Sequence, residues 1–335
     1  MHHLSRERTQ NLLTALRGME IAVVGDIMLD RYFWGSVHRV SPEAPVPVVD
    51  IDNESFHLGG AANVATNLLG LGAQPLLCGV VGDDSSGKML REIGLAAGLD
   101  VDGIAVEEGR PTTVKTRVIG NNQQIVRLDR ETRAHVAPNV IESVSDFLRK
   151  RTSLRGIILE DYDKGFLSPQ LIASVMAVAS ERSIPVFVDP KRRHFFDFTS
   201  CTLFKPNRKE AADALDIPLK TDADVREAGA MLLEKLDCDN VLITLGSEGM
   251  MLFERSGEVS SVPTRAKNVA DVSGAGDTVI ATLGAMVAAG ASMREAAALA
   301  NVAAGCVVAE PGIIAITADS LLTAVHEDET STRPS

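Results

Sequence analysis

The chain contains 335 residues, of which 45% are hydrophobic and only 4% aromatic, so it can bury a large core built mainly from aliphatic side chains. Its formal net charge of −12 argues against general nucleic-acid binding, which requires a basic face. Four scattered cysteines without metal-ligand spacing predict reduced thiols and a cytoplasmic location. No apolar run is long enough to span a bilayer, and the first residues lack the apolar region of a signal peptide, so we expect no membrane partner.

The start of the chain predicts a buried strand that ends in acidic residues. Hydrophobic periodicity indicates an amphipathic helix over Leu4 to Leu16 and a buried strand over Ile21 to Gly25. Asp26 follows this strand directly, and Asp30 follows a few residues later. Open α/β sheets bind ligands at the carboxyl ends of their strands, so Asp30 is a candidate binding residue. A solvated loop carboxylate is the alternative.

Two stretches, residues 31–52 and 111–130, predict a small β-sheet that stands off the main body. The first contains an aromatic cluster and then three prolines, a density that suits an edge hairpin and not a central strand. The second has Asn121 and Asn122 as the turn between two runs of alternating polar and apolar residues.

Trp34, the only tryptophan, lies in the first of these stretches beside Tyr32 and Phe33. A small isolated sheet with an apolar face is not stable in water and needs a surface to pack against. This predicts a two-fold homodimer formed through the small sheet. Packing of Trp34 on its own domain is the alternative.

The segment from Gly82 to Met89 nearly matches a phosphate-binding P-loop. Met89, however, lacks the hydroxyl that such a loop offers to magnesium, and Asp83 and Asp84 would repel phosphate. We therefore predict an ordinary strand-to-helix turn, capped by Asp84 or Ser85.

The second half of the chain alternates strands with helices. Buried strands are predicted at residues 156–159, 185–188 and 241–245, and a helix at 169–179 separates the first two. This rhythm predicts a mainly parallel sheet with helices on both faces. Polar residues follow successive strands, which indicates a shared cleft at one sheet edge. The polar end of the chain, residues 326–335, predicts a flexible tail.

The stretch from Asn268 to Val279 carries the most distinctive chemistry. Gly274, Ala275 and Gly276 open a predicted helix, whose first N–H groups and positive dipole end suit an anion. Asp277 adds a carboxylate that can accept a proton from an attacking hydroxyl. Amides for a transferred group and a carboxylate base together predict phosphoryl transfer. A tight loop followed by an ordinary first-turn carboxylate is the alternative.

The string Asp-Val-Ser-Gly-Ala-Gly-Asp-Thr at residues 271–278 resembles the C-terminal signature of the ribokinase-like (PfkB) carbohydrate kinases. The resemblance implies a single three-layer α/β/α domain over residues 1–335, with the small sheet as its lid. It makes the glycine turn the anion hole for the γ-phosphate and Asp277 the catalytic base. Asp30 matches the family's sugar-binding aspartate. The motif formed by Gly59, Gly60 and Asn63 resembles its sugar-holding signature.

The same resemblance places the nucleotide and the metal. Asn207-Arg208-Lys209-Glu210 matches the family's Asn-x-x-Glu element, which makes Glu210 the candidate magnesium ligand and Asn207 a nucleotide contact. Magnesium commonly uses one or two carboxylates with waters and phosphates, whereas an ordinary helix-start glutamate is the alternative. ATP and Mg²⁺ are thus the implied cofactors, and a monovalent cation such as K⁺ is left open. The other implied nucleotide contacts are Lys205, Thr244, Gly246, Gly249, Asn301 and Ala304.

Residues 26–32, 40–47 and 161–165 resemble a narrower group, the bacterial D-glycero-β-D-manno-heptose 7-phosphate kinases. These enzymes use ATP to phosphorylate the anomeric hydroxyl, which gives the 1,7-bisphosphate on the route to ADP-heptose and lipopolysaccharide. The resemblance implies a sugar phosphate as substrate and adds Asp161 to its contacts. The basic residues that could hold the sugar phosphate are Lys115, Arg117, Arg127, Lys164, Lys191 and Lys205.

Two alternatives stay open. The chain could be another kinase of this family, acting on a ketose or a 2-keto-3-deoxy acid, or a non-catalytic protein that binds a sugar or nucleotide on the same fold. The intact Asp277 and glycine turn favour an enzyme. A Rossmann dehydrogenase is disfavoured because no Gly-x-Gly-x-x-Gly follows the first strand.

Overall fold

A single large sheet organises the main body of the protein. The structure, a computed structural model, describes residues 5–264, 269–310 and 312–331, so Leu4 of the expected first helix and Asn268 of the glycine-rich stretch lie outside it. Within the described residues nine strands pair in the order β13-β12-β11-β10-β9-β8-β1-β4-β5. The strands from β11 to β5 are parallel, and β12 and β13 add an antiparallel edge. In chain order they are β1 (Glu20–Gly25), β4 (Gln74–Gly82), β5 (Asp100–Glu107), β8 (Gly156–Glu160), β9 (Val186–Asp189), β10 (Leu203–Phe204), β11 (Asn240–Thr244), β12 (Met250–Glu254) and β13 (Val259–Val262).

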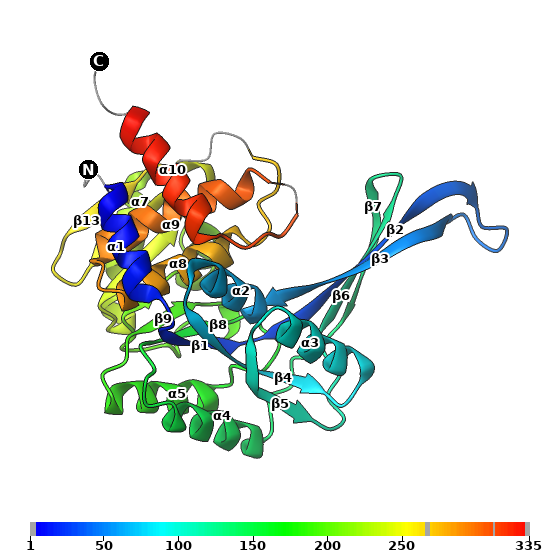
Figure 1. Ribbon diagram of the computed structural model, residues 1–335, viewed down its shortest axis with the longest axis horizontal. Helices are drawn as coiled ribbons and strands as arrows, with labels where there is room; N and C mark the ends of the chain where they lie inside the picture. The colour runs from blue at the N-terminus through cyan, green and yellow to red at the C-terminus, as the bar shows by residue number, and fades with distance from the viewer. Residues whose placement is uncertain (1–4, 265–268, 311, 332–335) are drawn as a thin grey trace.

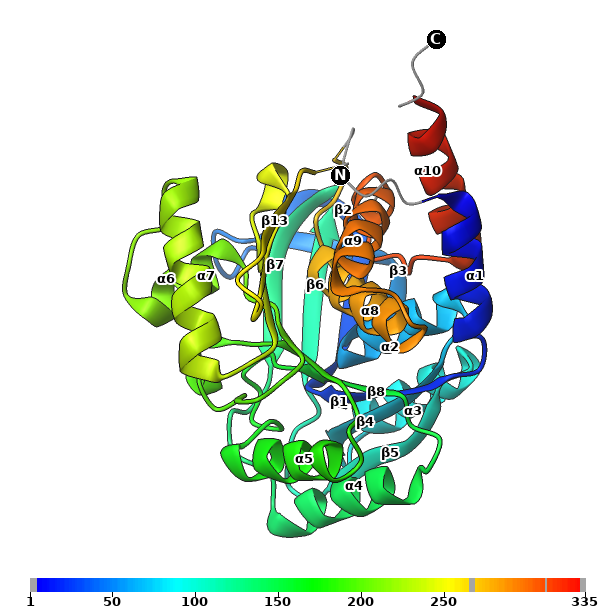
Figure 2. The ribbon, with the colours of Figure 1, turned by 90° about the vertical axis from the view of Figure 1, so that its left-hand side faces the viewer.

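Helices cover both faces of this sheet, which gives the three layers expected from the alternation of strands and helices (Figures 1 and 2). Each face has its own apolar core, because the central parallel strands are buried on both sides and carry almost continuous aliphatic runs. One core is lined by α1 (Arg6–Leu16), α2 (Ala61–Leu71), α3 (Ser85–Ala96), α8 (Ala275–Ala288), α9 (Met293–Val308) and α10 (Ala318–Ser331). The other is lined by α4 (Pro138–Lys150), α5 (Pro169–Glu181), α6 (Arg208–Leu215) and α7 (Asp222–Leu236).

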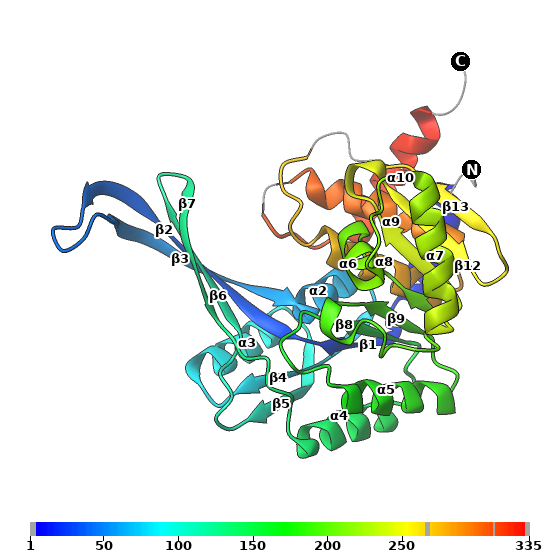
Figure 3. The ribbon, with the colours of Figure 1, turned by 180° about the vertical axis from the view of Figure 1, so that it is seen from behind.

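A second sheet of four strands projects from the body as an arm (Figures 1 and 3). We call this sheet the lid; it consists of β2 (Ile27–Val40), β3 (Pro47–Gly60), β6 (Val114–Gly120) and β7 (Gln123–Arg130). The order is β3-β2-β6-β7, with the two hairpins joined by a parallel pairing of β2 and β6. Asn121 and Asn122 have φ angles of 51° and 62°, as a tight two-residue hairpin requires, so the predicted turn is confirmed.

Two local expectations have clear outcomes. Asp84 caps α3 by accepting a hydrogen bond from the Gly87 N–H at 2.8 Å, so the P-loop-like segment is the predicted strand-to-helix turn. Part of the expected flexible tail is helical, because residues 326–331 continue α10, and residues 332–335 of that tail lie outside the described part of the chain. This helix packs beside α1 and α9, and these tertiary contacts stabilise a helix that the polar local sequence did not predict.

Among the described helices, none combines the length and apolar character needed to cross a membrane.

Candidate active site

Polar side chains gather where the central strands end. Asp26 follows β1, Glu160 and Asp189 end β8 and β9, and Lys205 follows β10. Lys205 Nζ lies 2.7 Å from Asp189 Oδ2, and both side chains are buried. A methyl group built on Gly276 would lie 3.8 Å from each of these two atoms, so the first turn of α8 faces the strand ends directly. The strand ends thus meet the first turn of α8 at one edge of the sheet, which is where the shared cleft is predicted.

Asp277 lies in the first turn of α8 and is only 5% exposed. Its Oδ2 accepts a hydrogen bond from Asn63 Nδ2 at 2.7 Å, and its Oδ1 accepts one from the Tyr162 hydroxyl at 2.7 Å. Burial raises the pKa of Asp277 to about 6, while the two hydrogen bonds favour the ionised form. At neutral pH this side chain is therefore mainly a carboxylate, in the state that a general base requires.

The glycine turn before Asp277 is shaped by a close contact. Gly274 has a φ of 79°, and a Cβ at this position would lie 3.0 Å from Asn63 Nδ2, so both backbone conformation and space favour glycine. The Ala275 N–H donates to the Val272 carbonyl at 3.3 Å. This leaves Gly276 and Asp277 as the sources of first-turn amides for an anion.

The sugar-binding motif predicted in the first half of the chain is brought to the same place. Asp30 is 4% exposed, and its carboxylate lies so close to Gly59 that a Cβ there would approach Oδ2 to 2.3 Å. Gly60 ends β3 and directly precedes α2, whose first turn carries the buried Asn63 that contacts Asp277. A continuous set of contacts thus joins Asp30 to the candidate base.

Most of the candidate phosphate-binding cations already have carboxylate partners. Arg117 donates to Asp30, so two residues predicted to hold the substrate are paired with each other. Lys164 pairs with Glu131 at 2.8 Å. Arg127 pairs with Asp129 at 2.9 Å on the lid, and Lys191 and Lys205 both contact Asp189.

Lys115 differs from these residues. In the part of the chain that the structure describes, no carboxylate lies within ion-pair distance of its ammonium group, which instead lies 5.4 Å from the centre of the Tyr162 ring. Burial lowers the pKa of Lys115, an effect that the charges of Asp30, Asp129 and Glu131 oppose from beyond ion-pair distance. A half-buried cation without a directly paired carboxylate is a suitable contact for an anionic ligand.

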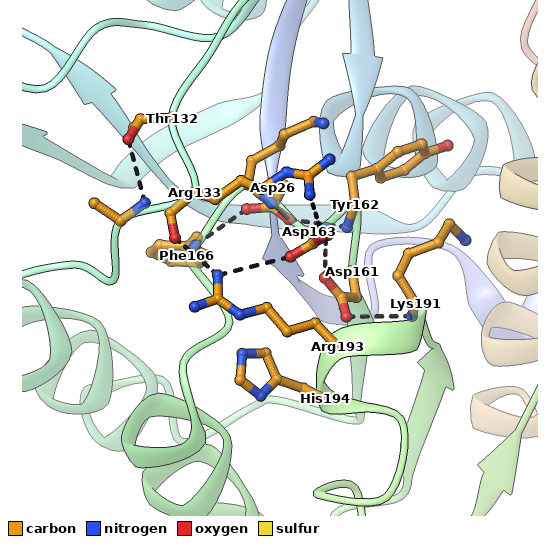
Figure 4. A network of polar contacts seen from close by, with 12 residues as sticks. Asp26, Thr132, Arg133, Asp161, Tyr162, Asp163, Phe166, Lys191, Arg193 and His194 are labelled. Carbon is orange, nitrogen blue, oxygen red and sulfur yellow. Dashed lines mark hydrogen bonds and ion pairs between the residues drawn. The ribbon is translucent and has the colours of Figure 1, made fainter. Parts of the chain in front are cut away.

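The loop after β8 is held by Asp26, a role that the sequence did not reveal (Figure 4). This buried carboxylate accepts three backbone N–H groups, from Tyr162 at 2.8 Å, Lys164 at 3.0 Å and Phe166 at 3.2 Å. Burial raises the pKa of Asp26, and the three hydrogen bonds oppose that effect. Asp26 thereby fixes the backbone from which Tyr162 and Lys164 reach the site.

Asp161 also accepts backbone hydrogen bonds that hold the loops at the site. It is 1% exposed and accepts backbone hydrogen bonds from Asp163 at 2.8 Å and Lys191 at 3.2 Å. Burial, followed by the charge of Asp26, raises its pKa to about 6. Its expected contact with the substrate stays a prediction, because its oxygens accept the described hydrogen bonds from its own loop and from the loop after β9.

The predicted metal residue, Glu210, belongs to the N-terminus of α6. It forms a capping box with Asn207, in which each side chain accepts the other's backbone N–H at 2.8 and 2.9 Å. Its other oxygen lies 2.8 Å from Lys191 Nζ, which is also 3.4 Å from Asp189 Oδ1. Two carboxylates thus flank a cation here, and this donor set fits Mg²⁺ bound through one or two carboxylates, waters and phosphates. Within the described residues no group of three or more His, Cys, Asp or Glu side chains forms a metal site.

The remaining nucleotide candidates lie along the β11–β13 side of the site. Thr244 pairs with Asn207 in an isolated bridge, and Gly246 begins the short turn after β11. Gly249 approaches the carbonyl of Val262, and Asn301 Nδ2 donates to the Pro263 carbonyl at 2.7 Å, so both border the same segment. Ala304 follows one turn later on α9 and is partly buried.

The fold is that of known sugar kinases. Phosphofructokinase-2 from Escherichia coli in complex with potassium matches with a TM-score of 0.76 and 17% identity over 93% of this chain and 99% of that chain. Ribokinase from Arabidopsis thaliana, complexed with ribose and ATP, matches with a TM-score of 0.73 and 21% identity over 92% of this chain and 99% of that chain. The architecture is therefore ribokinase-like, as predicted.

Sequence comparison defines the family. Residues 19–319 match the family described as pfkB family carbohydrate kinase, and the chain belongs to this family. It is accordingly a phosphotransferase that acts on an alcohol group. Among its relatives, the bifunctional protein HldE of Geobacter metallireducens is 45% identical over 310 residues, covering 92% of this chain and 63% of the relative. HldE of Trichlorobacter lovleyi is 42% identical over 332 residues, covering 98% of this chain and 68% of the relative. The chain thus spans about two thirds of the length of these relatives.

Proposed function

We propose that this chain transfers the γ-phosphoryl group of ATP to the anomeric hydroxyl of D-glycero-β-D-manno-heptose 7-phosphate, giving the 1,7-bisphosphate for ADP-heptose and lipopolysaccharide core biosynthesis. The observation that carries the reaction type is the buried Asp277 carboxylate at the N-terminus of α8. The choice of acceptor is supported by the identity to HldE proteins over most of the chain. Buried free cysteines support a cytoplasmic location.

Asp277 is the general base in this proposal. Each carboxylate oxygen has two lone pairs, so an acceptor hydroxyl can donate to Asp277 beside Asn63 and Tyr162. The hydroxyl proton moves to Asp277 as the acceptor oxygen attacks the γ-phosphorus, and the bond from this phosphorus to the bridging oxygen breaks to release ADP. The first-turn amides of α8, from Gly276 onward, stabilise the charge on the transferred group.

In this proposal the two lysines at the carboxyl ends of the strands, Lys191 and Lys205, bind the phosphates of ATP. Lys205 and Lys191 lie beside Asp189, where the triphosphate would approach the first turn of α8. Magnesium would supply charge neutralisation at the transferring phosphates, and Asp189 and Glu210 are the residues that would hold it. The monovalent cation stays open; potassium is present in the E. coli phosphofructokinase-2 complex.

Lys115 and Arg117 are proposed to hold the phosphate of the sugar. Lys115 has no carboxylate partner among the described residues, and Arg117 is oriented by Asp30, whose remaining lone pairs suit a sugar hydroxyl. Both cations lie on β6, so the substrate would bridge the lid and the main sheet.

The lid is proposed to form a homodimer. Trp34 is 41% exposed, although its ring stacks on Tyr32. A projecting sheet with several exposed apolar side chains gains stability by packing on a second copy. The other exposed large apolar residues of the lid strands and their hairpin are Val40, Val46, Ile51, Ile125, Val126 and Leu128.

The test is ATP turnover against a panel of sugar phosphates, with the product identified by phosphorus NMR and Asp277→Asn as the matched inactive control. Phosphorylation at the anomeric position of heptose 7-phosphate, with little turnover of unphosphorylated heptose, supports the proposal. Preferred turnover of a ketose or a 2-keto-3-deoxy acid would assign a different acceptor. Binding of sugar and nucleotide without turnover would indicate a non-catalytic protein.

A further inference from the structure

Tyr162 makes a direct contact with the candidate base. Its hydroxyl donates to Asp277 Oδ1 at 2.7 Å, while Asn63 Nδ2 donates to the other oxygen at the same distance. Burial raises the pKa of Tyr162 well above its ordinary value, and the charge of Asp277 adds to this effect. The phenol therefore keeps its proton, and together with Asn63 it fixes the plane of the carboxylate.

The backbone of Tyr162 is anchored independently of this contact (Figure 4). Its N–H donates to the buried Asp26 at 2.8 Å. The following residue, Asp163, has a φ of 54° and lies 3.4 Å from Arg133 and 3.8 Å from Arg193. Removal of the hydroxyl alone should therefore leave the loop and the aromatic ring in place.

The ring of Tyr162 also contacts two cations. Lys115 Nζ of the lid and Lys191 Nζ of the main body lie 5.4 and 5.3 Å from its centroid, within the range of cation–π interactions. The side chain of Tyr162 thus contacts an ammonium group of the lid strand β6, an ammonium group just after β9, and the carboxylate of the candidate base.

We infer that Tyr162 is a positioning residue for phosphoryl transfer: its hydroxyl keeps Asp277 ionised and oriented, while its ring holds Lys115 and Lys191 beside the reacting groups. The inference rests on the proposed role of Asp277 as the base. Asn63 of α2 is the other donor to that carboxylate. The charged groups that act on Asp277 or Tyr162 from the surrounding strand ends and lid are Glu160, Asp189, Lys115, Lys191 and Lys205.

Among these neighbours, Glu160 shows why a donor is needed. Its side chain is fully buried, and neither of its oxygens has a hydrogen-bond partner in the described structure. Burial, followed by the charges of Asp189 and Asp277, raises its pKa well above the ordinary range. The site therefore disfavours the ionised form of carboxylates that lack donors, and the hydrogen bonds from Asn63 and Tyr162 oppose this effect at Asp277.

The first experiment is the pH profile of kcat/KM for Tyr162→Phe. Loss of a hydrogen bond to the ionised form should raise the pKa of Asp277, so the acid limb of the profile should move upward by about one pH unit. Activity should then be about tenfold lower on the acid side and approach the wild-type value at alkaline pH. An unchanged acid limb, or the same loss at every pH, would overturn the inference.

Tyr32→Phe provides the matched control, because the chain has only two tyrosines. This variant removes the same atom from a ring that has no described hydrogen bond to Asp277, so its acid limb should stay at the wild-type pH whatever its effect on KM. Circular dichroism and thermal unfolding of both variants establish that they are folded.

A second measurement needs no substrate. In a Tyr32→Phe background Tyr162 is the only tyrosine, so its phenolate absorbance can be titrated directly. Adding Asp277→Asn should lower the pKa of Tyr162, because the negative charge next to the phenol is removed. Identical titrations in both backgrounds, over the pH range in which circular dichroism shows both proteins to be folded, would refute the contact. A shift in a protein that phosphorylates none of the tested sugars would retain the contact and reject the proposed acceptor, so the two failures are distinguishable.

Discussion

Replacing Asp277 by asparagine should separate catalysis from folding. The new side chain could accept the hydrogen bond from Asn63 and donate to the Tyr162 hydroxyl, since a hydroxyl both donates and accepts. The Asn63 amide and the Tyr162 oxygen would therefore each keep a hydrogen-bond partner. The amide cannot take the acceptor proton, however, so turnover should fall by about 100-fold or more. Nucleotide affinity should change little, because the backbone amides of α8 are untouched.

The same substitution should stabilise the fold at neutral pH. Burial raises the pKa of Asp277 from 3.8 to about 6. A carboxyl group whose pKa is higher in the folded state stabilises the folded protein fully at a pH below its unfolded pKa. This stabilisation is lost as the pH rises through the folded pKa. The difference of about two pKa units corresponds to about 3 kcal/mol at alkaline pH. Asparagine does not titrate and avoids this loss.

The assay combines kcat, nucleotide affinity and denaturant unfolding at several pH values. The stability gain of the variant should be largest at about pH 8, up to about 3 kcal/mol, and should shrink below about pH 6. Asp213→Asn on α6 is the control, because this carboxylate is exposed and pairs only with Lys209 among the described residues. Near-normal turnover would remove Asp277 from the role of base. A variant less stable than the wild type at about pH 8 would refute the idea that the buried carboxylate destabilises the fold.

Three further predictions address the substrate, the metal and the lid. Lys115→Met should raise KM for the sugar phosphate by about tenfold or more and leave KM for ATP unchanged, because a charge-assisted contact contributes about 1.5–3 kcal/mol; equal turnover of heptose with and without its phosphate would contradict this. Glu210→Gln should raise the Mg²⁺ concentration needed for half-maximal turnover, whereas Glu248→Gln, which alters an exposed pair on the neighbouring turn, should not. Sugar phosphate should change the fluorescence of Trp34 as the lid closes, and sedimentation should give the mass of a dimer; a monomer with an unresponsive Trp34 would rule out the clasped lid.

Local sequence patterns were enough to predict the layered architecture, the lid hairpin and the start of α8. The aliphatic strands and their rhythm with helices predicted a mainly parallel sheet between two helical layers, because backbone pairing and burial impose those periods on the chain. Asn121 and Asn122 predicted the lid hairpin, since few residues tolerate the φ angles that it requires. The glycine turn before Asp277 marked a helix N-terminus with a carboxylate in its first turn, and α8 begins there. These features depend on neighbours in the chain.

Only the tertiary structure shows which charged groups and hydrogen-bond donors contact one another. Asp277 accepts hydrogen bonds from Asn63, which is 214 residues away in the sequence, and from Tyr162, which is 115 residues away. Arg117 reached Asp30 only through the parallel pairing of β2 with β6, in which the two residues lie close in register. Whether a charged side chain is free or neutralised depends on such distant partners, because a buried ion needs a counter-charge that local sequence does not specify. For this reason Lys115 could not be told from its paired neighbours, nor Tyr162 recognised as a partner of the base, before the chain was folded.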